Sequence, residues 1–164
     1  MGVPYADYRQ PLATESSASP AAASPVYASY APTSTPTLTL GNYTKLNILG
    51  VNHETDGITL DTSTGDITVT DAGTYLIHAD FMIYQNGTGD LAQIILGMWL
   101  GDVFKLRLSI HKGVFETTTL TGHALIDLTA GEVINFRVFA SVTGGTAKLA
   151  QHNSSQGIYI TKIA

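Results

Sequence analysis

Apolar and polar residues alternate in short runs from Leu38 to the end of the chain, and residues that favour turns separate the runs. A period of two is the pattern of a β-strand with one buried face, and no segment combines a 3.6-residue period with helix caps. The longest β-forming run covers 73–84 and precedes Asn86-Gly87, a strong hairpin signal. The pattern predicts an all-β domain, an antiparallel sandwich or barrel, for which a jelly roll is one common solution. The other predicted strands lie within 66–70, 91–100, 103–110, 114–128, 132–142 and 157–163.

The prolines divide the chain in two, because all six lie in its first 36 residues. Proline lacks a backbone N–H and is excluded from central strands. We therefore expect residues 1–37, rich in Pro, Ala, Ser and Thr, to be an extended arm, and residues 38–164 to be the folded domain. Four tyrosines favour a docking arm over a passive linker, because tyrosine is enriched at interfaces. They are Tyr5, Tyr8, Tyr27 and Tyr30.

The composition limits the classes of partner that we expect. The chain has a net charge of −5 and only 13% charged residues, so we expect no binding to nucleic acid. So little charge, with 44% hydrophobic residues, indicates that part of the surface is covered in an oligomer. The absence of cysteine excludes disulfides and thiolate metal sites. No apolar run approaches the roughly 20 residues that span a bilayer, and the first residues do not form a secretory signal, so we expect no membrane partner.

Motifs for chemistry are sparse. The five histidines lack the H-x-H and H-E-x-x-H spacings, so each is expected at a surface or interface and no metal site is predicted. There is no G-x-S-x-G nucleophile elbow, and the glycine-rich spots are hairpin turns rather than phosphate cradles. Asp56, Asp61 and Asp66 match a calcium loop only weakly. We therefore predict no catalytic residue, no cofactor and no enzymatic activity.

Four segments resemble strands of the C1q and tumour necrosis factor superfamily, in matching order and spacing over roughly residues 58–163. Residues 71–78, DAGTYLIH, resemble its G-x-Y-[LF]-[IF] strand, and residues 63–69, STGDITV, resemble the strand that precedes it. Residues 125–136, LIDLTAGEVINF, resemble the L-x-L-x-x-G-[DE]-x-[VIL] stretch, and residues 155–160, SQGIYI, resemble the closing strand.

The resemblance implies a ten-stranded antiparallel jelly-roll sandwich that forms a compact homotrimer, with one face of several strands along the threefold axis. Because alternate side chains of a strand point to opposite faces, residues 75, 77, 79 and 81 are expected to fill the core. Ile158 and Ile160 are expected there too. The residues expected at the trimer interface are Leu76, His78, Leu120 and Tyr159, the third of these from its position in the family.

The arm and the resemblance together lead to a hypothesis about function. A trimer of this fold with a long arm and no disulfides is typical of a virion structural protein, and we expect a capsid decoration, or cement, protein of a tailed phage. Its arms would bind neighbouring major capsid subunits and tie them together on the outer surface of the capsid, after synthesis in the host cytoplasm.

Two other functions remain open. One is the receptor-binding tip of a phage head or tail fibre, which recognises a host glycan or protein. Trp99 weighs against that function, because it lies within an apolar run and is expected to be buried rather than displayed on a loop. The other is a bacterial extracellular C1q-like module.

Overall fold

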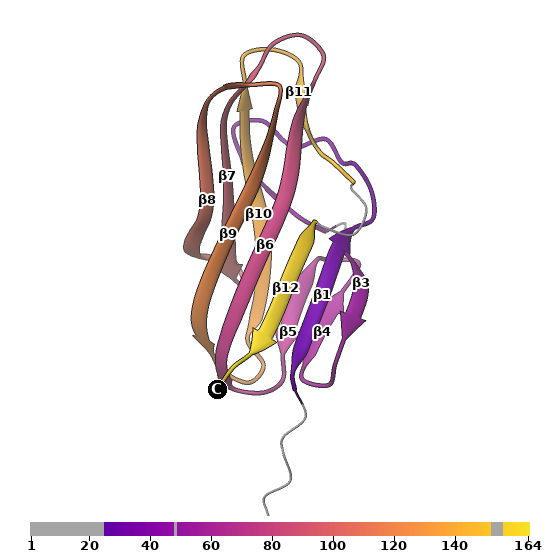
Figure 1. Ribbon diagram of the computed structural model, residues 1–164, viewed down its shortest axis with the longest axis vertical. Coiled ribbons are helices and arrows are strands. Elements are labelled where there is room, and N and C mark those ends of the chain that lie inside the picture. Colours follow the sequence, from indigo (N-terminus) through magenta and orange to yellow (C-terminus); the bar gives the residue numbers. More distant parts are fainter. Residues whose placement is uncertain (1–24, 48, 152–155) are drawn as a thin grey trace, which may run out of the picture.

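The computed structural model describes residues 25–47, 49–151 and 156–164. They form two antiparallel β-sheets packed face to face, with no helix in these ranges (Figure 1). The predicted all-β sandwich is therefore confirmed. The strands are β1 (Tyr27–Pro32), β2 (Tyr43–Lys45), β3 (Leu49–Glu54), β4 (Ile58–Asp61), β5 (Asp66–Val69), β6 (Gly73–Asn86), β7 (Leu91–Leu100), β8 (Val103–Phe115), β9 (Thr117–Leu128), β10 (Val133–Val142), β11 (Thr146–Leu149) and β12 (Gly157–Lys162).

The described residues thus contain twelve strands, where the resemblance implied ten. One of the twelve, the three-residue β2, is too short to show a period of two in the sequence. β2 exists because it pairs with β10 over Tyr43–Lys45, a contact between segments about 90 residues apart in the chain. Only tertiary pairing defines such an element.

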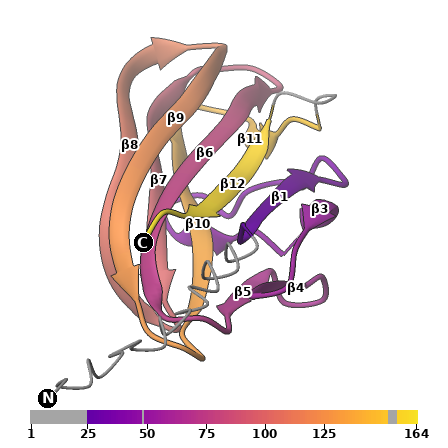
Figure 2. The same cartoon turned by 60° about the horizontal axis from the view of Figure 1, so that its bottom comes forward.

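We call the first sheet sheet A. Its strands follow the order β9–β6–β12–β1–β3, and β11 pairs with β6 beyond the end of β12 (Figure 2). β6 is its longest strand, and its residues 73–84 are paired with β9. The second sheet, sheet B, has the order β4–β5–β10–β7–β8, with β2 beside β10. β8 and β9 belong to different sheets but are separated in the chain only by Glu116, so this turn joins the sheets along one side of the sandwich.

Strict alternation of burial along β6 builds the core. Tyr75, Ile77, Ala79 and Phe81 are fully buried, whereas the side chains between them reach the outer face of sheet A. Ile158 and Ile160 are also fully buried, as predicted. Removing a large apolar side chain of this kind from water contributes about 1.5–3 kcal/mol to folding, so the inward face of β6 is a major source of stability.

β1 corrects the predicted boundary between arm and domain. Residues 27–32 are not part of an arm but a strand inside sheet A, paired with β12 on one edge and β3 on the other. Ala28 and Tyr30 point into the core and are almost completely buried. The proline pattern misplaced the boundary because Pro32 is the last residue of the strand, where a missing N–H is tolerated. The rest of the predicted arm, residues 1–24, lies outside the described residues.

Tyr30 is held by two close contacts. Its hydroxyl donates a hydrogen bond of 2.8 Å to Glu54 Oε1 on β3, and the same oxygen accepts from the backbone N–H of Leu60. Its carbonyl oxygen lies so close to Gly157 that a Cβ there would be 1.9 Å away, so only glycine fits between β12 and β1 at this point. Burial and then the hydrogen bond to Glu54 raise the pKa of Tyr30 far above its usual value.

This raised pKa predicts a loss of stability at alkaline pH. The unfolded chain ionises Tyr30 near pH 10, while the folded chain keeps it neutral, so the contribution is present below pH 10 and is lost as pH rises above it. Tyr30→Phe should lower the free energy of unfolding by about 1–2 kcal/mol at pH 7, because Glu54 loses a donor. It should also flatten the fall above pH 10, although Tyr75, whose pKa is raised by burial and by Asp71, retains part of it.

Urea unfolding from pH 7 to pH 11 measures both effects. Tyr27→Phe, which removes an exposed hydroxyl from the same strand, is the matched control and should leave the curve unchanged. An equally steep alkaline fall in Tyr30→Phe would contradict the assignment.

Candidate functional site

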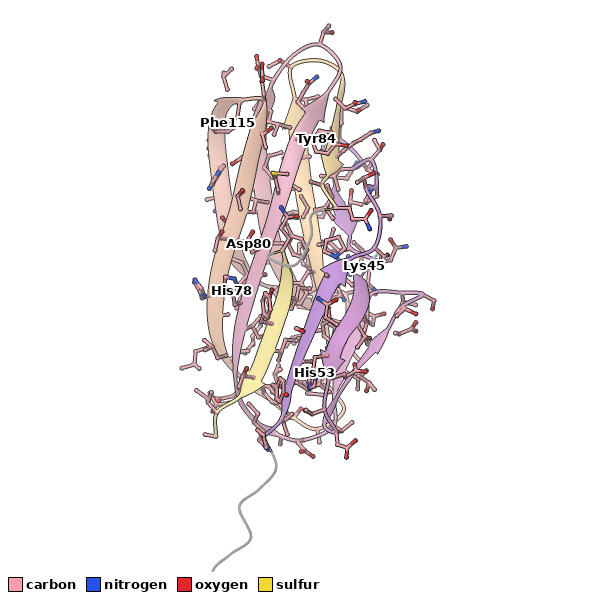
Figure 3. The ribbon with its side chains drawn as sticks, turned by 45° about the vertical axis from the view of Figure 1, so that its right-hand side comes forward. Lys45, His53, His78, Asp80, Tyr84 and Phe115 are labelled. Atoms are coloured by element: carbon pink, nitrogen blue, oxygen red, sulfur yellow. The ribbon has the colours of Figure 1, made fainter. Side chains whose placement is uncertain are left out.

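The outer face of sheet A carries a row of ring side chains from three neighbouring strands. His78 of β6 lies directly opposite His123 of β9 on one side and Tyr159 of β12 on the other. The Nδ1 atoms of the two histidines are 3.0 Å apart, and the His78 ring centroid is 5.6 Å from that of Tyr159. Figure 3 shows His78 and Asp80 along β6. The row therefore results from strand register and not from a local sequence motif.

Two leucines continue this surface toward the end of the sheet where the C-terminus lies. Leu76 and Leu125 are directly opposite each other in the β6–β9 pair, and their relative exposures are 45% and 64%. Together the two leucines form an exposed apolar patch, and patches of this kind often mark a contact with another protein. We call the surface made by Leu76, His78, His123, Leu125 and Tyr159 the histidine face.

Of the four residues predicted at the trimer interface, three lie on the outer face of sheet A and one lies in the core. Leu76, His78 and Tyr159 lie together on the histidine face, on the outer side of sheet A as parity predicted. Leu120 does not: its side chain is fully buried in the sandwich core, so its assignment to an interface is wrong. The inward positions of β9 run from Thr118 through Leu120 to Leu128, which leaves the odd-numbered residues outside. This alternation was visible in the sequence and would have selected His123 and Leu125.

The tyrosines that were predicted to dock on a partner lie in different surroundings. Tyr30 is part of the core, so it is not available to dock on another protein, and that assignment is wrong. Tyr27 is partly exposed at the start of β1, and its ring stacks on that of His53 with centroids 4.5 Å apart. Tyr5 and Tyr8 lie outside the described residues.

A second surface lies on the outer side of sheet B. Tyr43, Trp99, Phe104 and Phe139 come from β2, β7, β8 and β10, and their rings form an aromatic cluster. Trp99 meets Tyr43 and Phe104 edge-on, with centroids 4.8 and 5.1 Å away. Trp99 itself is 5% exposed, as predicted, whereas Phe104 is 48% exposed. The cluster thus has a buried centre and an open rim.

A glycine and several polar residues surround Trp99 and hold it in this position. Gly97 leaves room for its ring, because a Cβ there would come within 2.8 Å of the indole. The guanidinium of Arg137 lies over the ring, 5.0 Å from the centroid, and also pairs with Asp102 at 2.7 Å. Arg137 Nε donates to the buried Asn135, whose amide in turn donates to the backbone oxygen of Gly101. A cation over an indole face is attractive, so these contacts order the cluster.

The titratable groups with shifted pKa values have structural partners. Partial burial would raise the pKa of Asp66, but hydrogen bonds from Lys45, Thr64 and Asn135 and the charge of Lys45 outweigh it, so that pKa is lowered. The pKa of Asp61 is lowered by hydrogen bonds within its own turn, chiefly from Ser63. Among the described residues no three His, Asp or Glu side chains gather as a metal site within one chain, and no helix there is long and apolar enough to span a membrane. The two described clusters with functional potential are therefore the histidine face and the aromatic cluster.

Comparison with known proteins identifies the fold. No protein-family profile and no curated protein matches the chain. Among solved structures it is similar to Eiger TNF from S. frugiperda, with 16% identity and a TM-score of 0.59 over 85% of this chain and 93% of that one. It is also similar to murine APRIL at pH 8.0, with 13% identity and a TM-score of 0.62 over 85% of this chain and 100% of that one. These identities support the fold alone, and the TNF-like fold that the sequence motifs predicted is confirmed.

The chain's single tryptophan makes the aromatic cluster measurable by fluorescence. Phe104→Ser should shift the emission of Trp99 to longer wavelength and increase its quenching by acrylamide, because Phe104 covers the indole edge. The free energy of unfolding should fall by only about 1–2 kcal/mol, since Phe104 is half exposed. Val103→Ser, at a more exposed neighbouring position, should leave the emission unchanged, and an equal shift in both variants would contradict the described packing.

Proposed function

We propose that this chain is a non-enzymatic structural protein that acts as a homotrimer, and that its histidine face is where the copies meet. The observation that carries the proposal is the exposed Leu76–Leu125 pair on an open sheet face. Burying two half-exposed leucines and the rings beside them against another copy removes apolar surface from water, which favours association. The trimer is the assembly that the sequence resemblance implies.

The charge on this face supports association between copies. Of the six outward positions of β9, only Asp127 is charged, and the other five are Thr, His or Leu. On β6, Asp80 accepts a hydrogen bond from Thr121, and on β9, Asp127 accepts one from Thr74, so both carboxylates have partners within the chain. Interface cores are depleted of charge in the same way, because an unpaired charge loses hydration when it is covered.

We further propose that the trimer is a capsid decoration protein, attached to the major capsid protein on the outer surface of a virion. The described chain begins beside its C-terminus, where Lys162 N–H donates to the carbonyl of Val26 (Figure 1). The turn between β6 and β7 lies at the opposite end of the sandwich. The point at which the described chain begins is therefore at the opposite end of the domain from this turn. Three linked copies of residues 1–24, each with Tyr5 and Tyr8, would dock by multivalent contact, in which weak contacts add up to tight binding.

The aromatic cluster supports a second function, recognition of a host glycan or protein by a phage fibre or its tip. Phe104 and Tyr43 expose aromatic surface beside the ordered Trp99 and Arg137. Aromatic rings held rigidly over an apolar base are suited to binding with little loss of side-chain entropy. If the chain has this second function, the binding surface is on the domain itself and not in residues 1–24.

Introducing a charge on the histidine face tests the trimer. The wild-type protein should have the mass of three chains by light scattering, and Leu125→Glu should convert it to monomers, because three carboxylates would be buried together. Val114→Glu, at an exposed apolar position of sheet B, is the matched control and should remain trimeric. A monomeric wild-type protein, or a trimer that tolerates Leu125→Glu, would contradict the proposed interface.

Truncation tests the attachment. The deletion must stop at residue 24, because residues 27–32 form β1 and their loss would remove a strand from sheet A. The truncated protein should remain a trimer and keep its unfolding temperature but no longer bind undecorated capsids in a co-sedimentation assay. Continued binding by the truncated trimer would refute the attachment role. Adsorption to host cells that is lost in Phe104→Ser would favour the second function.

A further inference from the structure

We propose that His78 and His123 of one chain form a two-imidazole chelate for a divalent transition metal such as Zn²⁺. The two side chains come from directly opposed positions of β6 and β9, and their ring centroids are 4.6 Å apart. Their Nδ1 atoms face each other at 3.0 Å. Neutral imidazole nitrogen is a preferred ligand of zinc, copper and nickel.

The distance between the two Nδ1 atoms is close to what a metal requires. Zinc binds histidine nitrogen at about 2.0–2.1 Å, so two nitrogens of a tetrahedral site are about 3.3 Å apart. The observed 3.0 Å therefore has to increase by only about 0.3 Å. Both rings are on the outer face of sheet A, so the change needs no movement of the core.

The protonation states also allow metal binding. A hydrogen bond between two Nδ1 atoms needs a proton on one of them and a free lone pair on the other. Metal binding needs a lone pair on both, which places both remaining protons on Nε2. One ring therefore changes tautomer, its Nδ1 proton being exchanged for an Nε2 proton through water. Two neutral rings bind the cation with no net release of protons.

The strand pair orients the two ligands before the metal arrives. β6 and β9 are hydrogen-bonded neighbours over twelve residue pairs, so the two Cα atoms are fixed relative to each other. The ring of Tyr159 lies on the other side of His78 from His123, which limits the space into which His78 can turn. Preorganised ligands lose less conformational entropy on binding, and this increases affinity.

One chain supplies two ligands, so other groups complete the coordination shell. Water can fill the remaining positions in a single chain. In the proposed trimer the histidine face is covered by other copies, whose own His78 and His123 can replace water, and this last step rests on the proposed function. The chelate within one chain does not depend on it.

Titration of the untagged full-length protein with ZnCl₂ by calorimetry tests the proposal. We expect saturable binding of Zn²⁺ and none of Mg²⁺, which prefers oxygen ligands. His78→Asn and His123→Asn should each weaken zinc binding at least tenfold. His53→Asn is the matched control, because His53 is exposed on β3 of the same sheet and stacks on Tyr27, and it should bind zinc as the wild-type protein does. Zinc binding that survives both substitutions, or that is equally lost in His53→Asn, would overturn the proposal.

A measurement on the wild-type protein tests the chelate even if the histidine variants fail to fold. In long-range ¹H–¹⁵N spectra, zinc should shift the Nδ1 signals of two histidine rings and leave both rings protonated at Nε2. Unchanged histidine signals at saturating zinc would overturn the chelate. Light scattering on the same samples reports the trimer separately. A monomer that binds zinc through His78 and His123 refutes the proposed assembly alone, and a trimer that does not bind zinc refutes the chelate alone.

Discussion

The two-residue period of β6 constrains every other part of the sandwich. This strand is paired on one edge with β9 over residues 73–84 and on the other with β12 and then β11. Its inward residues, from Tyr75 to Phe81, are fully buried, and its outward residues include Leu76 and His78. A shift of one residue would expose the core set and bury the other, so the register of β6 is strongly determined. The core and the candidate interface are thus two consequences of one alternation.

The two candidate surfaces lie on opposite sides of the sandwich and have different chemistry. The histidine face on sheet A combines exposed leucines, ring side chains and few carboxylates, which suits contact between copies of one chain. The aromatic cluster on sheet B has a covered tryptophan, an ordered arginine and a half-exposed phenylalanine. If sheet A is covered by neighbours, the outer side of sheet B remains available to another partner. Under the two proposed functions, assembly and recognition would therefore use different residues.

Strand parity correctly predicted which side chains of β6 and β12 point outward. The wrong assignment on β9 was made without it. On β6 and β12 it assigned Leu76, His78 and Tyr159 to the outer face, where the structure places them. On β9 the position was taken from the family resemblance instead, and Leu120 is in the core. The burial of Trp99 was predicted from its apolar neighbours, but the rings around it come from β2, β8 and β10 and share no sequence motif. A period describes one strand, whereas a cluster across strands depends on which strands are neighbours.

The sequence by itself determined the all-β class, the inward and outward residues of the long strands and, through four short motifs, the TNF-like fold. These features follow from local turn chemistry and a period of two, which any stretch of chain carries within itself. Only the tertiary structure decided that Tyr27–Pro32 is a strand of the domain and that His78 and His123 meet. Both depend on pairing between distant segments: β1 lies between β3 and β12, and the two histidines are 45 residues apart in the chain. The hydrogen-bond register that joins such segments is a property of the assembled sheet, and no single segment contains it.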